Sequence, residues 1–322
     1  MADELARWAA ARAPDLLSRA EAEAVAVLRD ALLGAALRPE REPKSAPARA
    51  PRTTEVRGDA LWAYCVTRAG ESLPDGLEGV HGGRPRWVGS GELAALVSPV
   101  PLSDFGEEPL RSNLNDLAWL EQVARAHEAV LEVALAAGTI VPLRLCTIYE
   151  SEASVRRMLQ DERESLSRAL ELLDGRQEWG AKLLAHREKL MEAAHSRSGE
   201  TDDDLAETGG GGAYMLRRRQ ERQLREAADS LAAEIAEDVH ARLQGWASDA
   251  VTRPPQNRDL SGHEGDMLLN AAYLVPAERV DGLRELVAEL EKRYEALGVR
   301  IELTGPWPPY NFVPGGGAAA IA

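Results

Sequence analysis

Six histidines are the residues of this sequence best suited to acid–base or metal chemistry, and their spacing argues against both. No pair of them has zinc-ligand spacing in company with cysteine or glutamate, and the pattern H-E-x-x-H does not occur. The dipeptide His127-Glu128 stands alone. His127 falls on the apolar stripe of a predicted helix, so we expect a hydrogen-bonded core histidine rather than a ligand or a general base. The six stand at positions 81, 127, 186, 195, 240 and 263.

Two glycine-rich stretches are superficially similar to catalytic loops. The run Gly209–Gly212 lacks a following Lys-Ser/Thr and no predicted strand leads into it, so we expect no phosphate cradle there. Gly89-Ser90-Gly91 lacks the G-x-S-x-G spacing of a nucleophile elbow and lies in a predicted hairpin turn. We therefore predict no catalytic residue, no cofactor site and no metal site. A rival hypothesis, an enzyme with a ferredoxin-like regulatory domain, would need clustered titratable groups that the sequence does not contain.

Arg144 is a charged residue inside the otherwise apolar run from Ile140 to Ile148. Burying its charge alone would be very costly, so the side chain must be paired or must point to solvent. Glu128, on the preceding predicted helix, is the candidate partner. Two interpretations stay open. Arg144 is either one half of an ion pair that fastens helix to strand, or a recognition residue at the interface with a client protein.

A proline-rich aromatic segment, TGPWPPYNF at Thr304–Phe312, follows the last predicted strand, Val299–Leu303. Its three prolines remove backbone donors and fix φ at about −65°, so we expect the segment not to extend the sheet. The aromatic side chains either fold back onto the second sheet or bind a partner, because exposed aromatics on a rigid segment are typical anchors. The candidate partner-binding residues here are Trp307, Tyr310 and Phe312.

The same nine residues resemble the closing signature of the GvpL/GvpF family of gas vesicle accessory proteins. Ala60–Val66 resembles the opening strand of that family. Arg125–Glu128, followed after one helix by Gly138–Leu145, resembles its central block. The resemblance runs from about Leu61 to Val313, and residues 1–58 have no clear counterpart in it. It implies an α/β first domain, a ferredoxin-like second domain and a helical insertion.

The first 58 residues are expected to form a helical extension and a linker. Alanine, leucine, glutamate and arginine dominate residues 4–37, which predicts a helix. Arg38–Arg57 is basic and rich in proline, so we expect an extended linker. The linker either contacts the acidic body of the same chain or docks onto an acidic partner.

Residues 59–175 are expected to form an N-terminal α+β domain. Its apolar and aromatic runs predict strands at 61–67 and 139–149, the second interrupted by Pro142. A hairpin is predicted from 86–88 and 93–98. Asn115 is the expected cap of a helix over 116–137, and Ser151 begins another that continues to about Leu173. The two cysteines, Cys65 and Cys146, lie in apolar strand-like runs, where buried free thiols are expected.

Residues 176–313 predict the order β-α-β-β-α-β, the ferredoxin-like pattern, with an oversized first crossover. The expected strands are 176–184, 251–254, 267–275 and 299–303. Helices are expected over 185–194, 214–247 and from 277 to the stop at Gly298. The glycine-rich and acidic stretch 198–213 predicts a flexible loop, and 314–322 a disordered tail. The fold class is therefore α+β with two domains, the second carrying a long helical insertion.

The charge of the chain limits its partners. A net charge of −15 repels nucleic acid phosphates and anionic lipids, so neither is an expected partner. No signal peptide opens the sequence, and no apolar run approaches the roughly 20 residues of a membrane span. We expect a soluble, cytoplasmic, gas-vesicle-associated protein.

The leading hypothesis is a non-enzymatic assembly factor, as the resemblance implies. Its partners would be the hydrophobic major shell protein of the vesicle and other gas vesicle accessory proteins. Whether it acts as a chaperone, a nucleator or a minor vesicle component stays open. The alternative is a helical adaptor that self-associates through residues 4–37.

Overall fold

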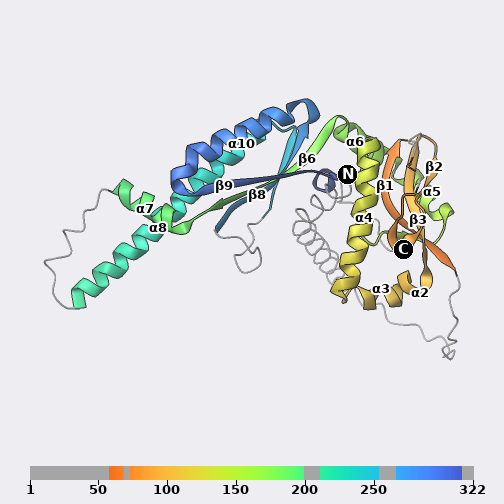
Figure 1. Ribbon diagram of the computed structural model, residues 1–322, viewed down its shortest axis with the longest axis horizontal. Helices are drawn as coiled ribbons and strands as arrows, with labels where there is room; N and C mark the ends of the chain where they lie inside the picture. Colours follow the sequence, from red (N-terminus) through yellow and green to blue (C-terminus); the bar gives the residue numbers. More distant parts are fainter. Residues whose placement is uncertain (1–57, 69–72, 75, 199–210, 254–265, 314–322) are drawn as a thin grey trace, which may run out of the picture. The chain divides into compact units, whose positions relative to one another are not determined.

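The computed structural model describes residues 58–68, 73–74, 76–198, 211–253 and 266–313, which Figure 1 draws as ribbons. They form two compact units. One unit holds the chain through Asp174 and again from Val313, and the other spans Gly175–Phe312. The predicted helix over 4–37, the basic linker, the tail 314–322 and most of the predicted loop 198–213 lie outside the described residues.

The sheet of the first unit is built around one fully buried strand. Strand β1 (Asp59–Arg68) is buried from Ala60 to Thr67, which explains its unbroken apolar run. It pairs with β3 (Leu93–Pro101), which pairs with β2 (Arg86–Ser90), confirming the predicted hairpin. On its other edge β1 pairs with two short strands, β4 (Val141–Pro142) and β5 (Ile148–Tyr149). All of these pairings are antiparallel.

The structure describes five helices in this unit. They are α2 (Leu102–Phe105), α3 (Glu107–Asn113), α4 (Leu117–Ala137), α5 (Glu152–Asp161) and α6 (Arg163–Leu173), and a 3-10 turn, η1, covers Val80–Gly82. Helix α4 lies against β1, and α5 lies against β2 and β3. Three exposed contacts attach α5 and α6 to the hairpin: the ion pairs Arg86–Glu152 and Arg163–Glu92, and the hydrogen bond from Gln160 to Ser90.

Three details of the sequence prediction are wrong in this unit. The cap of α4 is Asp116, whose carboxylate accepts from the backbone N–H groups of Ala118 and Trp119, while Asn115 donates its side-chain amide to the carbonyl of Arg111. Residues 139–149 are not one strand, because a turn separates β4 from β5. The helix that begins after Ser151 is two helices, since the chain leaves helical geometry at Glu162.

The sheet of the second unit contains β6 (Arg176–Ala185), β7 (Asp249–Arg253), β8 (Asp266–Pro276) and β9 (Val299–Trp307). Its order is β7-β8-β6-β9, and every pairing is antiparallel. The helices are α7 (Arg187–Ser198), α8 (Gly211–Gln244) and α10 (Val280–Tyr294). Short 3-10 turns cover Ala277–Arg279, Glu295–Leu297 and Tyr310–Phe312. The predicted mixture of helices and strands is thus confirmed as two antiparallel sheets with helices.

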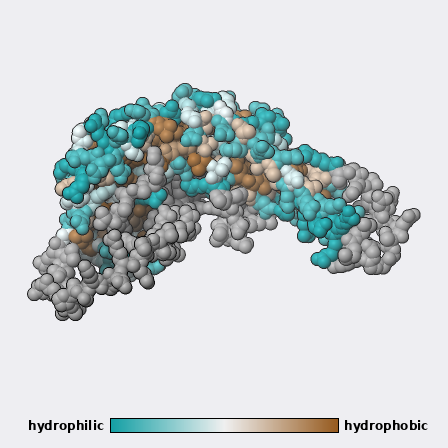
Figure 2. Space-filling view, turned by 180° about the vertical axis from the view of Figure 1, so that it is seen from behind, coloured by the Kyte–Doolittle hydropathy of each residue, from teal (hydrophilic) through white to brown (hydrophobic). Residues whose placement is uncertain are grey.

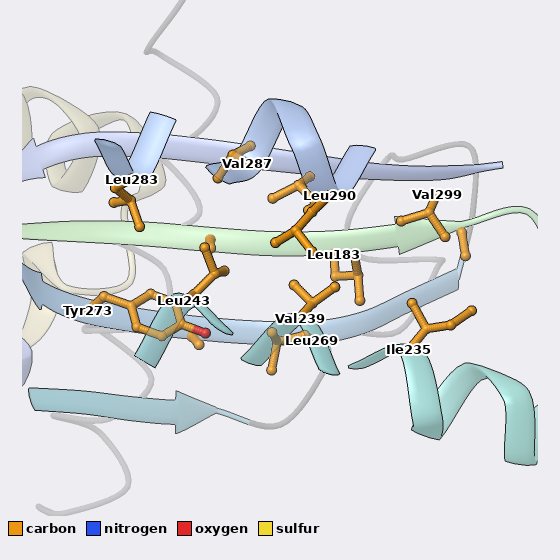
Figure 3. Close-up of a cluster of buried hydrophobic side chains, with 14 of the residues drawn as sticks. Leu183, Ile235, Val239, Leu243, Leu269, Tyr273, Leu283, Val287, Leu290 and Val299 are labelled. Carbon is orange, nitrogen blue, oxygen red and sulfur yellow. The ribbon is translucent and has the colours of Figure 1, made fainter. Parts of the chain in front are cut away.

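Helices α8 and α10 bury their apolar stripes on one face of this second sheet, as Figure 3 shows. Spacings of three and four residues place each stripe on one side of its helix. Alternate residues of β6 and β8 point into the same layer. This layer includes Leu183, Leu269 and Tyr273 from the strands, Ile235, Val239 and Leu243 from α8, and Leu283, Val287 and Leu290 from α10.

The last strand is longer than predicted. Gly298 ends the preceding helical segment with φ of 66°, as expected, but β9 then continues to Trp307. Thr304 pairs with Gly180 and Trp307 with Glu178, across a register shift and a cis Gly305–Pro306 peptide bond. The expectation that the prolines would keep this segment out of the sheet is wrong. Because β9 is an edge strand, Pro306 is tolerated there without a ladder hydrogen bond.

Candidate functional site

The tail signature Thr304–Phe312, here called the clasp, is packed into the second unit. Trp307, Tyr310 and Phe312 are all buried, with exposures of 6%, 9% and 5%. The indole N–H of Trp307 donates to the hydroxyl of Thr304 at 3.1 Å. These three aromatic side chains therefore lie inside the protein, and their role in partner binding stays a prediction.

Asn311 attaches the clasp to the sheet. Its backbone N–H donates to one carboxyl oxygen of Glu178 at 3.0 Å, and its side-chain amide donates to the other at 2.6 Å. Arg253 on β7 donates to the side-chain oxygen of Asn311. One asparagine thus connects two strands, β6 and β7, that are separated by β8 in the sheet.

Glu178 is the buried acidic residue of this arrangement, with only 1% exposure. Its neighbour Trp179 belongs to the core beneath α8 and α10. Because successive residues of a strand point to opposite faces, Glu178 points to the other face of the sheet. The clasp therefore meets the face that the two helices leave uncovered. The sequence prediction missed Glu178, although a single acidic residue in a predicted buried strand was a usable signal.

The central block and the opening strand meet in the first unit, around His127. The imidazole is 1% exposed, and its Nδ1 accepts a hydrogen bond from the indole N–H of Trp62 at 2.9 Å. The ring proton must then sit on Nε2, where the backbone of Leu143 provides a hydrogen bond. Burial lowers the pKa of His127 from 6.5 to about 3, so the ring is neutral near pH 7. The prediction of a hydrogen-bonded core histidine is confirmed.

Tyr64 extends this group toward the loop after β1. Its ring stacks on His127 with centroids 5.3 Å apart, and its hydroxyl lies 2.7 Å from that of Ser98. The Tyr64 oxygen accepts from the backbone N–H of Val80 at 2.8 Å, so its own proton is available to Ser98. Burial raises the pKa of Tyr64. A Cβ on Gly79 would lie 2.3 Å from the Tyr64 hydroxyl, so only glycine fits at that position. We call Trp62, Tyr64, Ser98 and His127 the His127 cluster.

Arg144 lies beside this cluster, in a turn rather than in the predicted strand. Its carbonyl accepts from the backbone N–H of Thr147 at 3.2 Å and from the Thr147 hydroxyl at 2.7 Å. Within this turn Cys146 has φ of 65°. The Arg144 side chain is half-buried. Its ion pair with Glu128 and its role in recognition both stay predictions.

The described part of the chain holds no group of three or more His, Cys, Asp or Glu residues placed to bind a metal ion. Cys65 and Cys146 are buried free thiols, as expected, and burial raises the pKa of Cys65. Among the described helices, none has the length and apolar character needed to span a bilayer. Arg144 belongs to the first unit and the clasp to the second.

Comparison with protein families gives a match to the gas vesicle synthesis protein GvpL/GvpF over residues 60–314. The chain belongs to the GvpL/GvpF family. The matched region contains the opening strand, the central block and the clasp, so the resemblance seen in those motifs is confirmed. A role connected with gas vesicles follows from membership of this family.

Relatives within the GvpL/GvpF family align over most of the chain. Gas vesicle protein L of Streptomyces sp. (strain CB03234) is 38% identical over 257 residues, which is 78% of this chain and 91% of the relative. Gas vesicle protein F of the same organism is 28% identical over 260 residues, covering 79% of this chain and 99% of the relative.

Solved structures of the family share the fold. The crystal structure of GvpF from Anabaena sp. PCC7120 aligns with a TM-score of 0.58 at 20% identity, over 80% of this chain and 96% of that one. The structure of GvpF from Microcystis aeruginosa aligns with a TM-score of 0.54 at 20% identity, over 79% of this chain and 98% of that one.

Proposed function

We propose that this GvpL/GvpF protein is a non-enzymatic, cytoplasmic assembly factor that binds the hydrophobic major shell protein of the gas vesicle. One observation carries the proposal: several motif residues bind other parts of the chain and hold the fold. His127 and Tyr64 are buried and hydrogen-bonded within the first unit, and Asn311 of the clasp is hydrogen-bonded to the buried Glu178. Function would then reside in the surfaces that these residues hold in shape.

An apolar client explains why such surfaces would be needed. A subunit that is very hydrophobic exposes apolar area until it is incorporated, and a soluble protein that covers this area prevents aggregation. Figure 2 shows hydrophobic areas between the hydrophilic residues of one face. Leu172, at 39% exposure, is the most exposed large hydrophobic side chain among the described residues. Binding would therefore use hydrophobic side chains that are only partly exposed.

Arg144 is the proposed contact residue of the first unit. It is half-buried in a turn that the His127 cluster holds through Leu143, so its position is fixed before any partner arrives. In the second unit Trp307, Tyr310 and Phe312 would act by keeping the clasp in shape. We infer a ferredoxin-like fold for this unit, because its strand order is β7-β8-β6-β9, with the helices α7 and α8 before β7 and α10 before β9.

Co-expression with the major shell protein, followed by affinity capture of this chain, tests the proposal. We expect the wild-type chain to retain the shell protein. We expect Arg144→Ala to lower the captured amount several-fold while its circular dichroism and melting temperature stay close to wild type. Arg125→Ala, an exposed arginine on α4 that pairs with Glu121, is the matched control and should capture normally.

Two results would contradict the proposal. If the folded wild-type chain captures no shell protein, the assembly-factor role with this client is wrong. If Arg144→Ala unfolds the protein, Arg144 is a structural residue, and crosslinking of the wild-type complex with peptide mapping must then locate the contact.

A further inference from the structure

A row of arginines on α8 stands out in a chain whose net charge is −15. The ten residues Arg217–Glu226 contain five arginines and two glutamates, a local charge of +3. The helix runs from Gly211 to Gln244, and its N-terminal part projects beyond the strands beside α7 (Figure 1). Four of these arginines have exposed side chains that the structure describes: Arg218, Arg219, Arg222 and Arg225. We call these four the arginine stripe.

The spacing of the stripe aligns three of its four charges. Arg218, Arg222 and Arg225 are separated by four and three residues, which places them along one side of the helix. With a rise of 1.5 Å per residue, the row is about 10 Å long. Like charges at these spacings repel one another and weaken a helix. A partner that supplies negative charge would remove this repulsion.

Two of these four arginines have no partner among the residues that the structure describes. Arg222 makes a loose ion pair with Glu226 at 3.5 Å, and both side chains are about 70% exposed (73% and 68%). Within the described residues, Arg219 and Arg225 form no ion pair and no hydrogen bond. By contrast, two other arginines of the same unit form ion pairs. Arg187 pairs with Asp229 and Asp266, and Arg242 pairs with Asp238.

The rest of α8 decides which kind of anion fits. Its apolar stripe, with Ala228, Leu231 and Ile235, is buried in the core, so the side chains of α8 that the structure describes, from Arg218 onward, offer no free apolar face to a lipid bilayer. The acidic remainder of the protein repels a long polyanion such as a nucleic acid. A short acidic peptide avoids both problems, and guanidinium groups bind carboxylates through paired hydrogen bonds. An extended strand spans the stripe with about three or four residues.

We propose that the arginine stripe of α8 is a docking site for an acidic polypeptide segment of another protein. The site does not depend on binding of the shell protein, because it is polar and belongs to the second unit, whereas Arg144 belongs to the first. Each exposed ion pair contributes little by itself, so recognition requires several carboxylates at once. Screening over about 8 Å at physiological ionic strength also makes the interaction strongly dependent on salt.

Fluorescence anisotropy of the full-length protein with a fluorescein-labelled peptide of ten glutamates tests the proposal. We expect saturable binding at 50 mM NaCl and loss of at least tenfold in affinity at 300 mM NaCl. The double variant Arg219→Glu/Arg225→Glu should bind at least tenfold more weakly, because it reverses the two unpaired charges. Glutamate and arginine have similar helix propensities, so the helix should persist in circular dichroism.

The matched control is Arg111→Glu/Arg125→Glu, which makes the same change of net charge at exposed arginines of the first unit. It should bind the peptide as the wild type does. Equal weakening of both double variants would overturn the proposal, because binding would then follow net charge alone. Tighter binding of a 20-nucleotide single strand or of phosphatidylserine vesicles would also overturn it. So would peptide binding that appears only in Asp202→Asn/Asp203→Asn/Asp204→Asn, since the occupant would then be this chain's own acidic run.

Discussion

The His127 cluster of the first unit and the Glu178–Asn311 contact of the second both place a titratable side chain in a nearly closed interior. The side chains of His127 and Glu178 are each 1% exposed. His127 belongs to the central block of the family, and Glu178 is hydrogen-bonded to Asn311 of the clasp. They differ in chemistry. His127 is kept as a neutral ring that accepts from an indole and donates to a backbone carbonyl, whereas Glu178 offers two acceptor oxygens to one asparagine. The partner of His127 comes from a buried strand, and the partner of Glu178 from the 3-10 turn Tyr310–Phe312.

The two sites also differ in how many elements they hold together. The His127 cluster joins β1, α4 and the turn at Arg144, so its loss would loosen several elements of the first unit together. The clasp joins only the end of the chain to β6 and β7, so its loss would release a segment while the core under α8 and α10 remains. Substitutions in each site, compared by peptide-resolved hydrogen exchange, can separate these two modes.

The largest expected effect is that of His127→Ala, which should lower the free energy of unfolding by about 3–4 kcal/mol. The substitution leaves a cavity and deprives the buried indole N–H of Trp62 of its acceptor. Chemical denaturation measures the loss, and hydrogen exchange should place it within residues 58–174. His127→Gln should lose less, because its amide can both accept from Trp62 and donate to Leu143. The exposed His195→Ala is the control and should change stability by less than about 0.5 kcal/mol. Equal loss in the Ala and Gln variants would show that ring packing, not hydrogen bonding, matters at this site.

A smaller effect, about 2–3 kcal/mol, is expected for Glu178→Ala. The backbone and side-chain N–H groups of Asn311 lose their acceptors, but Asn311 is only partly buried, so water can replace part of the interaction. Hydrogen exchange should rise in residues 304–312 and little elsewhere. The exposed Glu295→Ala serves as the matched control. If exchange rises throughout the second unit, the clasp supports the whole core, and the contrast with the His127 cluster is wrong.

Acidification from pH 6.5 to pH 5 should remove about 2 kcal/mol of the stability that His127 contributes. The pKa of His127 is lowered from 6.5 to about 3 in the folded protein, so between these values the unfolded chain binds the additional proton. The stability that His127 contributes is thus complete above pH 6.5 and falls as the pH drops toward 3, by about 1.4 kcal/mol per unit. Other groups also titrate in this range. The measurement is therefore the difference in the free energy of unfolding between wild type and His127→Gln, obtained from urea denaturation at each pH. Parallel pH dependence in the two proteins would contradict the assigned pKa.

Periodic patterns along the chain were sufficient to predict most helices and strands, because each depends on neighbours three, four or two residues away. The stripes of α4, α8 and α10 are examples, and so is His127, whose position on the α4 stripe predicted its burial. Long-range contacts escaped the sequence prediction. Glu178 and Asn311 are 133 residues apart, and nothing local marks them as partners.

The errors in element boundaries have the same origin. Residues 139–149 have the composition of a strand, but only the two ends find a place beside β1. The strand β9 passes through Pro306 because its position at the sheet edge requires no hydrogen bond there. The ion pair Arg144–Glu128 and the ferredoxin-like arrangement of the second unit stay predictions.

The smallest expected effect concerns Asn115, which the sequence prediction named as the cap of α4, and its neighbour Asp116, which is the cap in the structure. Asp116→Ala should cost about 1 kcal/mol, because the Asp116 carboxylate accepts from two N–H groups in the first turn of α4. Asn115→Ala should cost less than about 0.5 kcal/mol, since it removes one exposed hydrogen bond to the carbonyl of Arg111. Urea denaturation of the two variants under identical conditions measures the difference. A larger loss for Asn115→Ala would show that Asn115 is the cap of α4, as the sequence predicted. The first turn of the helix that carries His127 would then differ from the one described above.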